Sequence, residues 1–153
     1  MTAVITRVSS ASVDIGSERV AQMGKGLLIL LGVEKGDTKK EAEYLAGKCA
    51  GLRIFEDSEG KMNLSAAEVG GELVVVTNFT LCGDCVKGKR PSFDRAERPE
   101  TAEPMSRYFV ECCRSYGFEV QTGRFGADMK VASVNDGPIT LVLDTRKMLE
   151  GRL

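Results

Sequence analysis

Apolar and polar residues alternate along residues 3–15 of the chain, and the alternation resumes over residues 18–23 after a Gly16-Ser17 pair. A period of two is typical of a half-buried strand, and a Gly-Ser pair between two such runs is typical of a turn. Residues 26–33 are almost continuously apolar, as expected for a strand buried on both faces. The N-terminal part of the chain therefore predicts a hairpin followed by a strand at the centre of a sheet.

The first expected helix covers residues 38–51. Thr38 followed three residues later by Glu41 is a capping-box signal. The apolar residues that recur at helical spacing are Ala42, Leu45, Ala46 and Cys49. We therefore expect Cys49 to lie in the core.

The second expected helix covers residues 101–116, with Pro104 in its first turn and Gly117 just beyond its end. Its expected apolar stripe consists of Met105, Tyr108, Phe109, Cys112 and Tyr116. On this interpretation Cys112 is a core residue.

Further strands are expected at residues 53–56, 61–65, 72–81, 119–122, 129–135 and 139–144, whereas residues 146–153 carry no clear signal. The last two strands are separated by the segment Asn135-Asp136-Gly137-Pro138-Ile139-Thr140. A Gly-Pro pair normally marks a turn, because proline has no N–H for a ladder. Here the strand pattern resumes at once, which indicates a tight corner inside regular structure. Taken alone, these six residues favour a turn with a trans proline, and a cis Gly137–Pro138 bond is the alternative.

Composition narrows the class of protein. A length of 153 residues with 42% hydrophobic and 28% charged residues indicates one globular domain spanning residues 1–153. No apolar run approaches the roughly 20 residues that cross a bilayer, and the N-terminus lacks a signal-peptide pattern. We expect a cytoplasmic protein without a membrane partner.

The chain contains no histidine, which excludes Ser-His and Cys-His mechanisms and histidine-ligated metal sites. Its five cysteines include Cys82-Gly-Asp-Cys85, a spacing shared by redox pairs and half zinc sites. The residues that follow Cys85 are a poor helix, and the remaining adjacent pair, Cys112 and Cys113, points in different directions. A thiol-redox function is therefore a secondary hypothesis, and we expect no metal ion.

Residues 82–99 have no periodicity but are rich in cations: Lys87, Lys89, Arg90, Arg95 and Arg98. The net charge of the whole chain is −1, so a general nucleic-acid binder is excluded and a local patch is not. Such a loop is suited to phosphate groups, although charged loops are often simply solvated.

Several short segments together resemble the D-aminoacyl-tRNA deacylase family. These segments are Arg7-Val8, residues 53–57, 77–81 and 123–127, and the Asn135–Thr140 motif, and the resemblance runs from Met1 to about Thr145. Thr80, Lys87-Gly88, Pro91 and Phe93 also match. The family's first motif commonly reads Ser-Gln-x-x-Thr, so this chain departs from it at Thr77 and Asn78.

The resemblance implies a compact, barrel-like α+β fold with a mostly antiparallel sheet and two main helices. It also implies a homodimer in which the Gly137–Pro138 bond is cis and the motif of one subunit reaches into the active site of the other. The implied reaction is hydrolysis of the ester between a D-amino acid and the 3′-terminal adenosine of tRNA. No cofactor is expected.

The resemblance also assigns roles to residues. The expected catalytic set is Thr77, Asn78, Phe79 and Thr80, with backbone N–H groups of Phe79 and Thr80 stabilising the oxyanion. The expected chiral filter consists of Asn135, Gly137, Pro138 and Thr140. The excess of cations in the loop 82–99, and not the resemblance, gives the expected tRNA-binding residues, which are Lys87, Lys89 and Arg90. Thr80 as a nucleophile is the less favoured alternative, because no suitable base is available to activate it.

The departure at Asn78 shortens the side chain by one methylene relative to glutamine, about 1.5 Å of reach. It places any side-chain contact to the adenosine in question but leaves backbone roles intact. The sequence therefore leaves two alternatives: editing of glycine or a mischarged L-amino acid on tRNA, or a non-catalytic module that binds a tRNA end or a nucleotide.

Overall fold

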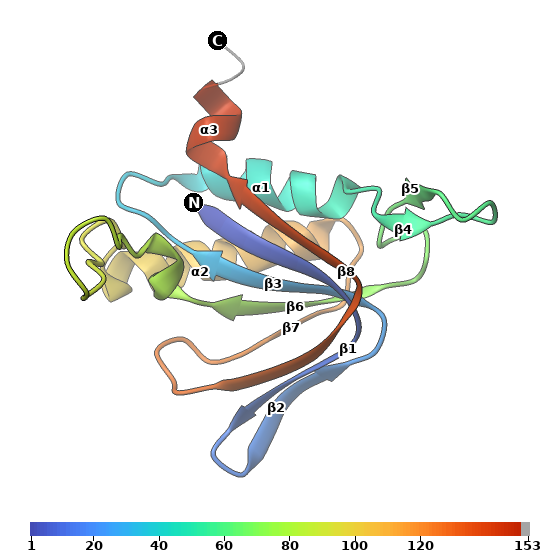
Figure 1. The fold of residues 1–153 in the computed structure, drawn as a ribbon, viewed down its shortest axis with the longest axis horizontal. Helices are drawn as coiled ribbons and strands as arrows, with labels where there is room; N and C mark the ends of the chain where they lie inside the picture. Colours follow the sequence, from blue (N-terminus) through green and yellow to red (C-terminus); the bar gives the residue numbers. More distant parts are fainter. Residues whose placement is uncertain (151–153) are drawn as a thin grey trace.

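The long N-terminal strand β1 (Thr2–Ile15) organises the sheet in the computed structural model, which describes residues 1–150 (Figure 1). Its first half lies between β3 (Gly26–Gly32) and β8 (Lys130–Asp144), and its second half lies between β2 (Glu18–Met23) and β8. All three pairings are antiparallel. The predicted hairpin and central strand are confirmed.

The sheet continues from β3 through two parallel pairings, to β6 (Glu72–Thr77) and then to β7 (Val120–Thr122). The far strands β7 and β2 then approach each other. The Gln121 side chain accepts a hydrogen bond from the backbone N–H of Gln22 at 2.9 Å and donates one to its carbonyl at 2.7 Å. The mixed sheet is therefore a nearly closed barrel.

Within residues 1–150, three α-helices accompany the sheet. The helices α1 (Lys39–Gly51) and α2 (Pro99–Ser115) contact each other and cover one face, and α3 (Thr145–Glu150) follows β8. A separate two-stranded sheet joins β4 (Phe55–Glu56) and β5 (Met62–Leu64). Within the described part of the chain, no helix is both long enough and apolar enough to cross a membrane.

Alternating residues of the central strands build two apolar cores. Leu27, Ile29 and Leu31 belong to the core between the sheet and the helices, whereas Leu28 belongs to the core inside the barrel. This division explains why residues 26–33 are apolar throughout, because both faces of β3 are buried.

The first predicted helix and its N-terminal cap are confirmed. Thr38 is the N-cap of α1, and the reciprocal capping box with Glu41 is present, with the Glu41 carboxylate accepting from the Thr38 N–H at 2.7 Å. The side chain of Cys49 is fully buried, as predicted.

The second helix differs from the prediction. It begins at Pro99, so Pro104 lies inside the helix and not in its first turn. Its buried face includes Phe109 and Cys113, whereas Cys112 is only partly buried and Tyr116 is 53% exposed. Within the predicted stripe, Phe109 is confirmed as a core residue. Met105, Tyr108 and Cys112 are only partly buried against the core, on the side of α2 where the Tyr108 hydroxyl donates to the carboxylate of Glu43 of α1, so the prediction of Cys112 as a core residue was wrong.

Two strand predictions were also wrong. The strand β6 ends at Thr77, and Phe79–Cys82 form the 3₁₀-helix η1. The expected separate strands 129–135 and 139–144 are one element, β8, because both halves pair with β1. The register of this pairing shifts on either side of Val8, opposite the Gly-Pro motif. Thr145–Glu150 form α3 although residues 146–153 carry no clear sequence signal, and residues 151–153 of that segment lie outside the described residues.

Candidate active site

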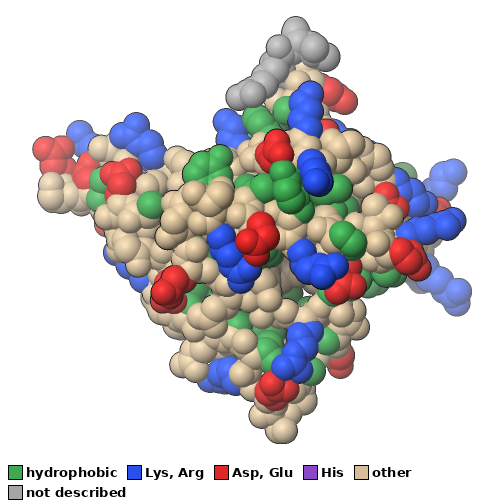
Figure 2. Space-filling view, turned by 180° about the vertical axis from the view of Figure 1, so that it is seen from behind, with side chains coloured by type: hydrophobic (Ala, Val, Ile, Leu, Met, Phe, Trp, Pro, Cys, Tyr) green, Lys and Arg blue, Asp and Glu red, His purple; other side chains and the backbone are tan. Residues whose placement is uncertain are grey.

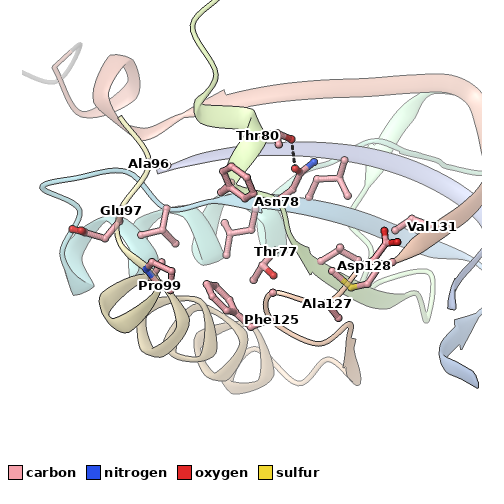
Figure 3. A pocket seen from close by; sticks show the side chains of 18 of the residues that line it. Thr77, Asn78, Thr80, Ala96, Glu97, Pro99, Phe125, Ala127, Asp128 and Val131 are labelled. Atoms are coloured by element: carbon pink, nitrogen blue, oxygen red, sulfur yellow. Dashed lines mark hydrogen bonds between the residues drawn. The ribbon is translucent and has the colours of Figure 1, made fainter. Parts of the chain in front are cut away.

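A cavity of about 1030 Å³ opens between η1, the start of α2 and the segment that leads into β8 (Figure 3). Its apolar lining includes Leu28, Leu30 and Val76, whose side chains also belong to the barrel core or pack against it. A cavity of this volume matches the size of small-ligand sites. It is a candidate site for a ligand of nucleoside size.

The four residues expected to be catalytic all line this cavity: Thr77, Asn78, Phe79 and Thr80. They come together because β6 ends at Thr77 and the chain turns directly into η1. The N–H of Asn78 donates to the carbonyl of Leu31 at 2.7 Å, which attaches this turn to the central strand β3. Sequence reasoning placed these residues at a strand end, and the structure places them at the wall of a cavity.

The start of η1 leaves backbone donors available. The first N–H groups of a helix have no intrahelical partner, and no side chain in the described chain caps η1. The hydrogen bonds from Leu81 N to Asn78 O at 3.2 Å and from Gly83 N to Thr80 O at 3.0 Å shape the turn without using the N–H groups of Phe79 and Thr80. This pair of adjacent donors can stabilise a negative charge that develops on a bound oxygen.

The side chains of Asn78 and Thr80 are joined to each other. The Thr80 hydroxyl donates to the Asn78 side-chain oxygen, so its proton is not directed at a base (Figure 3). The carboxylate residues in the lining, Glu97 and Asp128, lie at opposite ends of the cavity. The arrangement holds Thr80 in place and does not form a nucleophile–base pair.

The segment around Gly137 and Pro138 is exposed and is not among the residues that line the cavity of its own chain. The Gly137–Pro138 peptide bond is cis. The Asn135 side chain clamps the segment, accepting from Ile139 N at 2.9 Å and donating to the Thr140 hydroxyl at 2.7 Å. The expected catalytic and chiral-filter residues therefore do not share one cavity within a single chain.

The side chain of Arg7 holds this motif by a hydrogen bond to its backbone, a role that the sequence did not reveal. Its side chain is buried, and Nε donates to the carbonyl of Asp136 at 3.0 Å while Nη1 donates to the carbonyl of Ile54 at 2.8 Å. The position of Arg7 in β1 could have indicated this role. Side chains of a strand alternate between its two faces, and Arg7 lies on the same face as the buried residues Ala3 and Ile5. A cation at a buried strand position indicates fixed polar partners.

The loop between η1 and α2 carries Lys87, Lys89 and Arg90, all exposed and outside the cavity lining. Lys and Arg side chains gather at the corresponding edge of the molecule in the space-filling view (Figure 2). Phe93 of the same loop does line the cavity. The loop therefore joins the basic edge to the site.

The two cysteines of the CxxC sequence have different environments. Cys82 is buried, with its thiol 3.7 Å from the carbonyl of Val33, whereas Cys85 is exposed. Burial raises the pKa of the Cys82 thiol, which disfavours the reactive thiolate. Among residues 1–150, no group of three or more Cys, Asp or Glu side chains could hold a metal ion.

The sequence did not indicate that several other residues line the cavity. Arg98 and Pro99 at the start of α2 contribute to the wall, and so do residues 125–129 before β8. The Gly-Arg-Phe-Gly bend at residues 123–126 was a recognisable motif, but no local pattern connects it to Thr77 or Phe79. These segments meet only because β6, β7 and β8 belong to one barrel.

The fold and the cavity define a class: a single-domain α+β protein with adjacent free backbone donors in the wall of a ligand-sized, largely apolar cavity. The family described as D-Tyr-tRNA(Tyr) deacylase matches residues 4–144. A D-aminoacyl-tRNA deacylase from Thermodesulfovibrio yellowstonii is 53% identical over 95% of this chain and 100% of its own length. A D-aminoacyl-tRNA deacylase from Geotalea uraniireducens is 55% identical over 98% of this chain and 97% of its own length.

Two solved structures have the same fold as this chain. A protein described as c-Myc DNA Unwinding Element Binding Protein superimposes with a TM-score of 0.88 at 38% identity, over 94% of this chain and 98% of that one. A probable eukaryotic D-amino acid tRNA deacylase shares the fold, with a TM-score of 0.79 at 16% identity, over 94% of this chain and 100% of that one. The chain belongs to the D-Tyr-tRNA(Tyr) deacylase family, and it is a hydrolase.

Proposed function

We propose that this protein hydrolyses the ester that joins a D-amino acid to the 3′-terminal adenosine of tRNA, in the cytoplasm where aminoacyl-tRNA is used. The observation that carries the proposal is the uncapped start of η1 in the cavity wall, formed by the motif residues Thr77–Thr80. The cavity volume of about 1030 Å³ suits an aminoacyl-adenosine end.

In this mechanism water attacks the ester carbonyl carbon, and the N–H groups of Phe79 and Thr80 stabilise the oxyanion of the tetrahedral intermediate. Collapse breaks the bond to the ribose 3′-oxygen, which takes up the proton that the attacking water loses and leaves as free tRNA, while the D-amino acid is released. The neighbouring ribose 2′-OH assists by positioning the water. A single oxyanion donor of this kind contributes a factor of roughly 10²–10³ in kcat. Such a site needs neither histidine nor a cofactor.

Chirality is read by the Gly137 and Pro138 carbonyls supplied by the partner in a homodimer. Two observations support this arrangement: the motif is exposed, and it does not line the cavity of its own chain. The strand that carries it also exposes apolar side chains, with Val134 at 56% and Val142 at 69%. A carbonyl close to the substrate Cα leaves room for hydrogen on one side and for a side chain only on the other.

The test compares D-Tyr-tRNA and L-Tyr-tRNA as substrates, following loss of the ester. Turnover of the D-ester with retention of the L-ester supports the proposal. Equal hydrolysis of both esters, or none of either, contradicts it. Tight binding of the D-ester without turnover identifies a tRNA-end binding module instead.

One observation favours a second candidate, editing of glycine or a mischarged L-amino acid on tRNA. The Asn78 side chain, which stands where the family commonly has glutamine, accepts a hydrogen bond from the Thr80 hydroxyl, so its oxygen is already engaged within the chain. Gly-tRNA and a mischarged L-aminoacyl-tRNA belong in the same assay. Turnover of either at a rate equal to that of the D-ester supports the broader range.

Neutralising Lys87, Lys89 and Arg90 together should weaken tRNA binding and flatten its salt dependence by about 0.7–0.9 log–log unit for each lost phosphate contact. The reason is that all three side chains are exposed on the loop beside the cavity without lining it. Binding is measured at several salt concentrations, with a D-aminoacyl-adenosine as the matched short substrate. Equal losses on both substrates would show that the loop supports the cavity itself.

Hydrolysis should persist in EDTA and in the Cys82→Ser/Cys85→Ser double variant, with rates within about threefold of the unsubstituted protein. The expectation rests on a buried Cys82 whose thiol pKa is raised and on a chain without histidine. Steady-state rates with and without the chelator are the measurement. Inactivation by EDTA that added zinc reverses would contradict the mechanism.

A further inference from the structure

The basic loop is closed at its base. Asp84 and Ser92 exchange backbone hydrogen bonds in both directions, each 2.8 Å long. The residues between them, which include Lys87 and Arg90, are therefore carried on a loop whose two ends are joined to each other.

Phe93 follows this closure and packs against both ends of η1. Its ring centroid is 5.2 Å from that of Phe79 in an edge-to-face arrangement, with an interplanar angle of 73°. At the other end of η1, a Cβ added to Gly83 would lie 3.1 Å from Cε1 of Phe93, so the ring also lies close against the backbone there. The half-buried Phe93 thus spans the segment that presents the Phe79 and Thr80 N–H groups.

Phe93 is itself held by the part of the loop that follows it. The N–H of Ala96 donates to the Phe93 carbonyl at 3.0 Å. Backbone bonds from Lys35 to Arg95 at 2.9 Å and from Glu97 to Val33 at 3.0 Å then attach the loop to the chain that leaves β3. The position of Phe93 is therefore set by the segment that follows β3, whereas the Phe79 side chain is 59% exposed.

We propose that Phe93 is a positioning residue. Its ring packs η1 against the base of the basic loop and so fixes the Phe79 and Thr80 N–H groups at the cavity wall. This inference rests on the proposed function, because those N–H groups are the proposed oxyanion donors. A shift of about 1 Å in such donors is enough to lower a rate by roughly a hundredfold. The same contact between Phe93 and η1 joins the loop proposed to bind the tRNA phosphates to the segment proposed to stabilise the oxyanion.

The test uses Phe93→Ala, with Phe93→Tyr as the conservative variant and Val86→Ala as a control, since Val86 is 86% exposed at the same loop. Phe93→Ala should lower kcat at least about tenfold on both D-Tyr-tRNA and a D-aminoacyl-adenosine, with the KM for the tRNA within about threefold. Phe93→Tyr retains the ring and should restore kcat to within about threefold. A loss of kcat on both substrates separates this role from that of Lys87, Lys89 and Arg90.

Hydrogen exchange without substrate gives an independent measurement. Phe93→Ala should speed exchange of the hydrogen-bonded Leu81 and Gly83 amides at least about tenfold, with the Asn78 amide, bonded to β3, as the internal reference. Unchanged exchange at Leu81 and Gly83, or a change confined to the KM for tRNA, would overturn the proposal. If the unsubstituted protein does not hydrolyse D-esters, the proposed function fails, and the exchange result alone decides whether Phe93 holds η1.

Discussion

Gly137→Ala should lower kcat/KM for D-Tyr-tRNA at least about a hundredfold. Gly137 has a φ of +131°, a conformation that residues with a Cβ rarely adopt. An added Cβ would lie 2.9 Å from Cγ1 of Ile139, 3.0 Å from the Ile139 nitrogen and 3.2 Å from Nη2 of Arg7. The backbone must move, and the carbonyls proposed to read chirality move with it.

The matched control is Gly16→Ala, in the turn between β1 and β2. Gly16 also has a positive φ, +57°, but an added Cβ there has no neighbour within 4 Å. It should lower the free energy of unfolding by about 1 kcal/mol through backbone strain and leave turnover unchanged. Kinetics and thermal unfolding of both variants are the measurements. Full activity in Gly137→Ala would remove the motif from the proposed chiral filter.

Arg7→Met should reduce the free energy of unfolding by about 3 kcal/mol and lower turnover at least about tenfold. Methionine fills part of the same space but cannot donate to the carbonyls of Asp136 and Ile54, which Arg7 bonds at 3.0 Å and 2.8 Å. The carbonyls of Asp136 and Ile54 then lose their hydrogen-bond donor, and residues 136–138 lose the contact that holds them to β1. Denaturant unfolding and D-Tyr-tRNA kinetics are the measurements.

Arg19→Met is the control for loss of an arginine from the surface. The Arg19 side chain is 51% exposed and pairs with Asp14 at 2.9 Å, a contact that solvent screens. Its loss should change the free energy of unfolding by no more than about 1 kcal/mol and leave activity intact. Comparable effects of the two substitutions would show that Arg7 has no special role beneath the motif.

Local sequence patterns predicted those elements whose shape depends on neighbouring residues. The hairpin β1–β2, the buried strand β3 and the capping box of α1 follow from side-chain period and capping chemistry, which act within a few residues. The buried face of α2 followed only in part, since Phe109 lies in the core as predicted. Met105 and Cys112 are apolar and correctly spaced, but contact with α1 places them at the edge of the core and Cys113 inside it.

The same distinction holds at the site. The four residues Thr77–Thr80 form one short motif at the end of a strand, so the sequence alone could group them, and the structure places them in the wall of one cavity. The contribution of Phe93 and of residues 125–129 to the same cavity could not be predicted, because no short-range signal joins them. Arg7 contacts a carbonyl 129 positions further along the chain.

The sequence by itself determined the hairpin β1–β2, the buried strand β3 and the helix α1, together with the motifs that identify the family and the absence of any histidine-based chemistry. Only the tertiary structure decided that residues 130–144 form one strand, because both halves pair with β1 across a shifted register. It also decided that the Gly-Pro motif lies outside the cavity of its own chain while the basic loop reaches η1 through Phe93. The physical reason is that short-range periodicity specifies which face of an element is buried, whereas pairing and packing between distant segments specify what lies against that face.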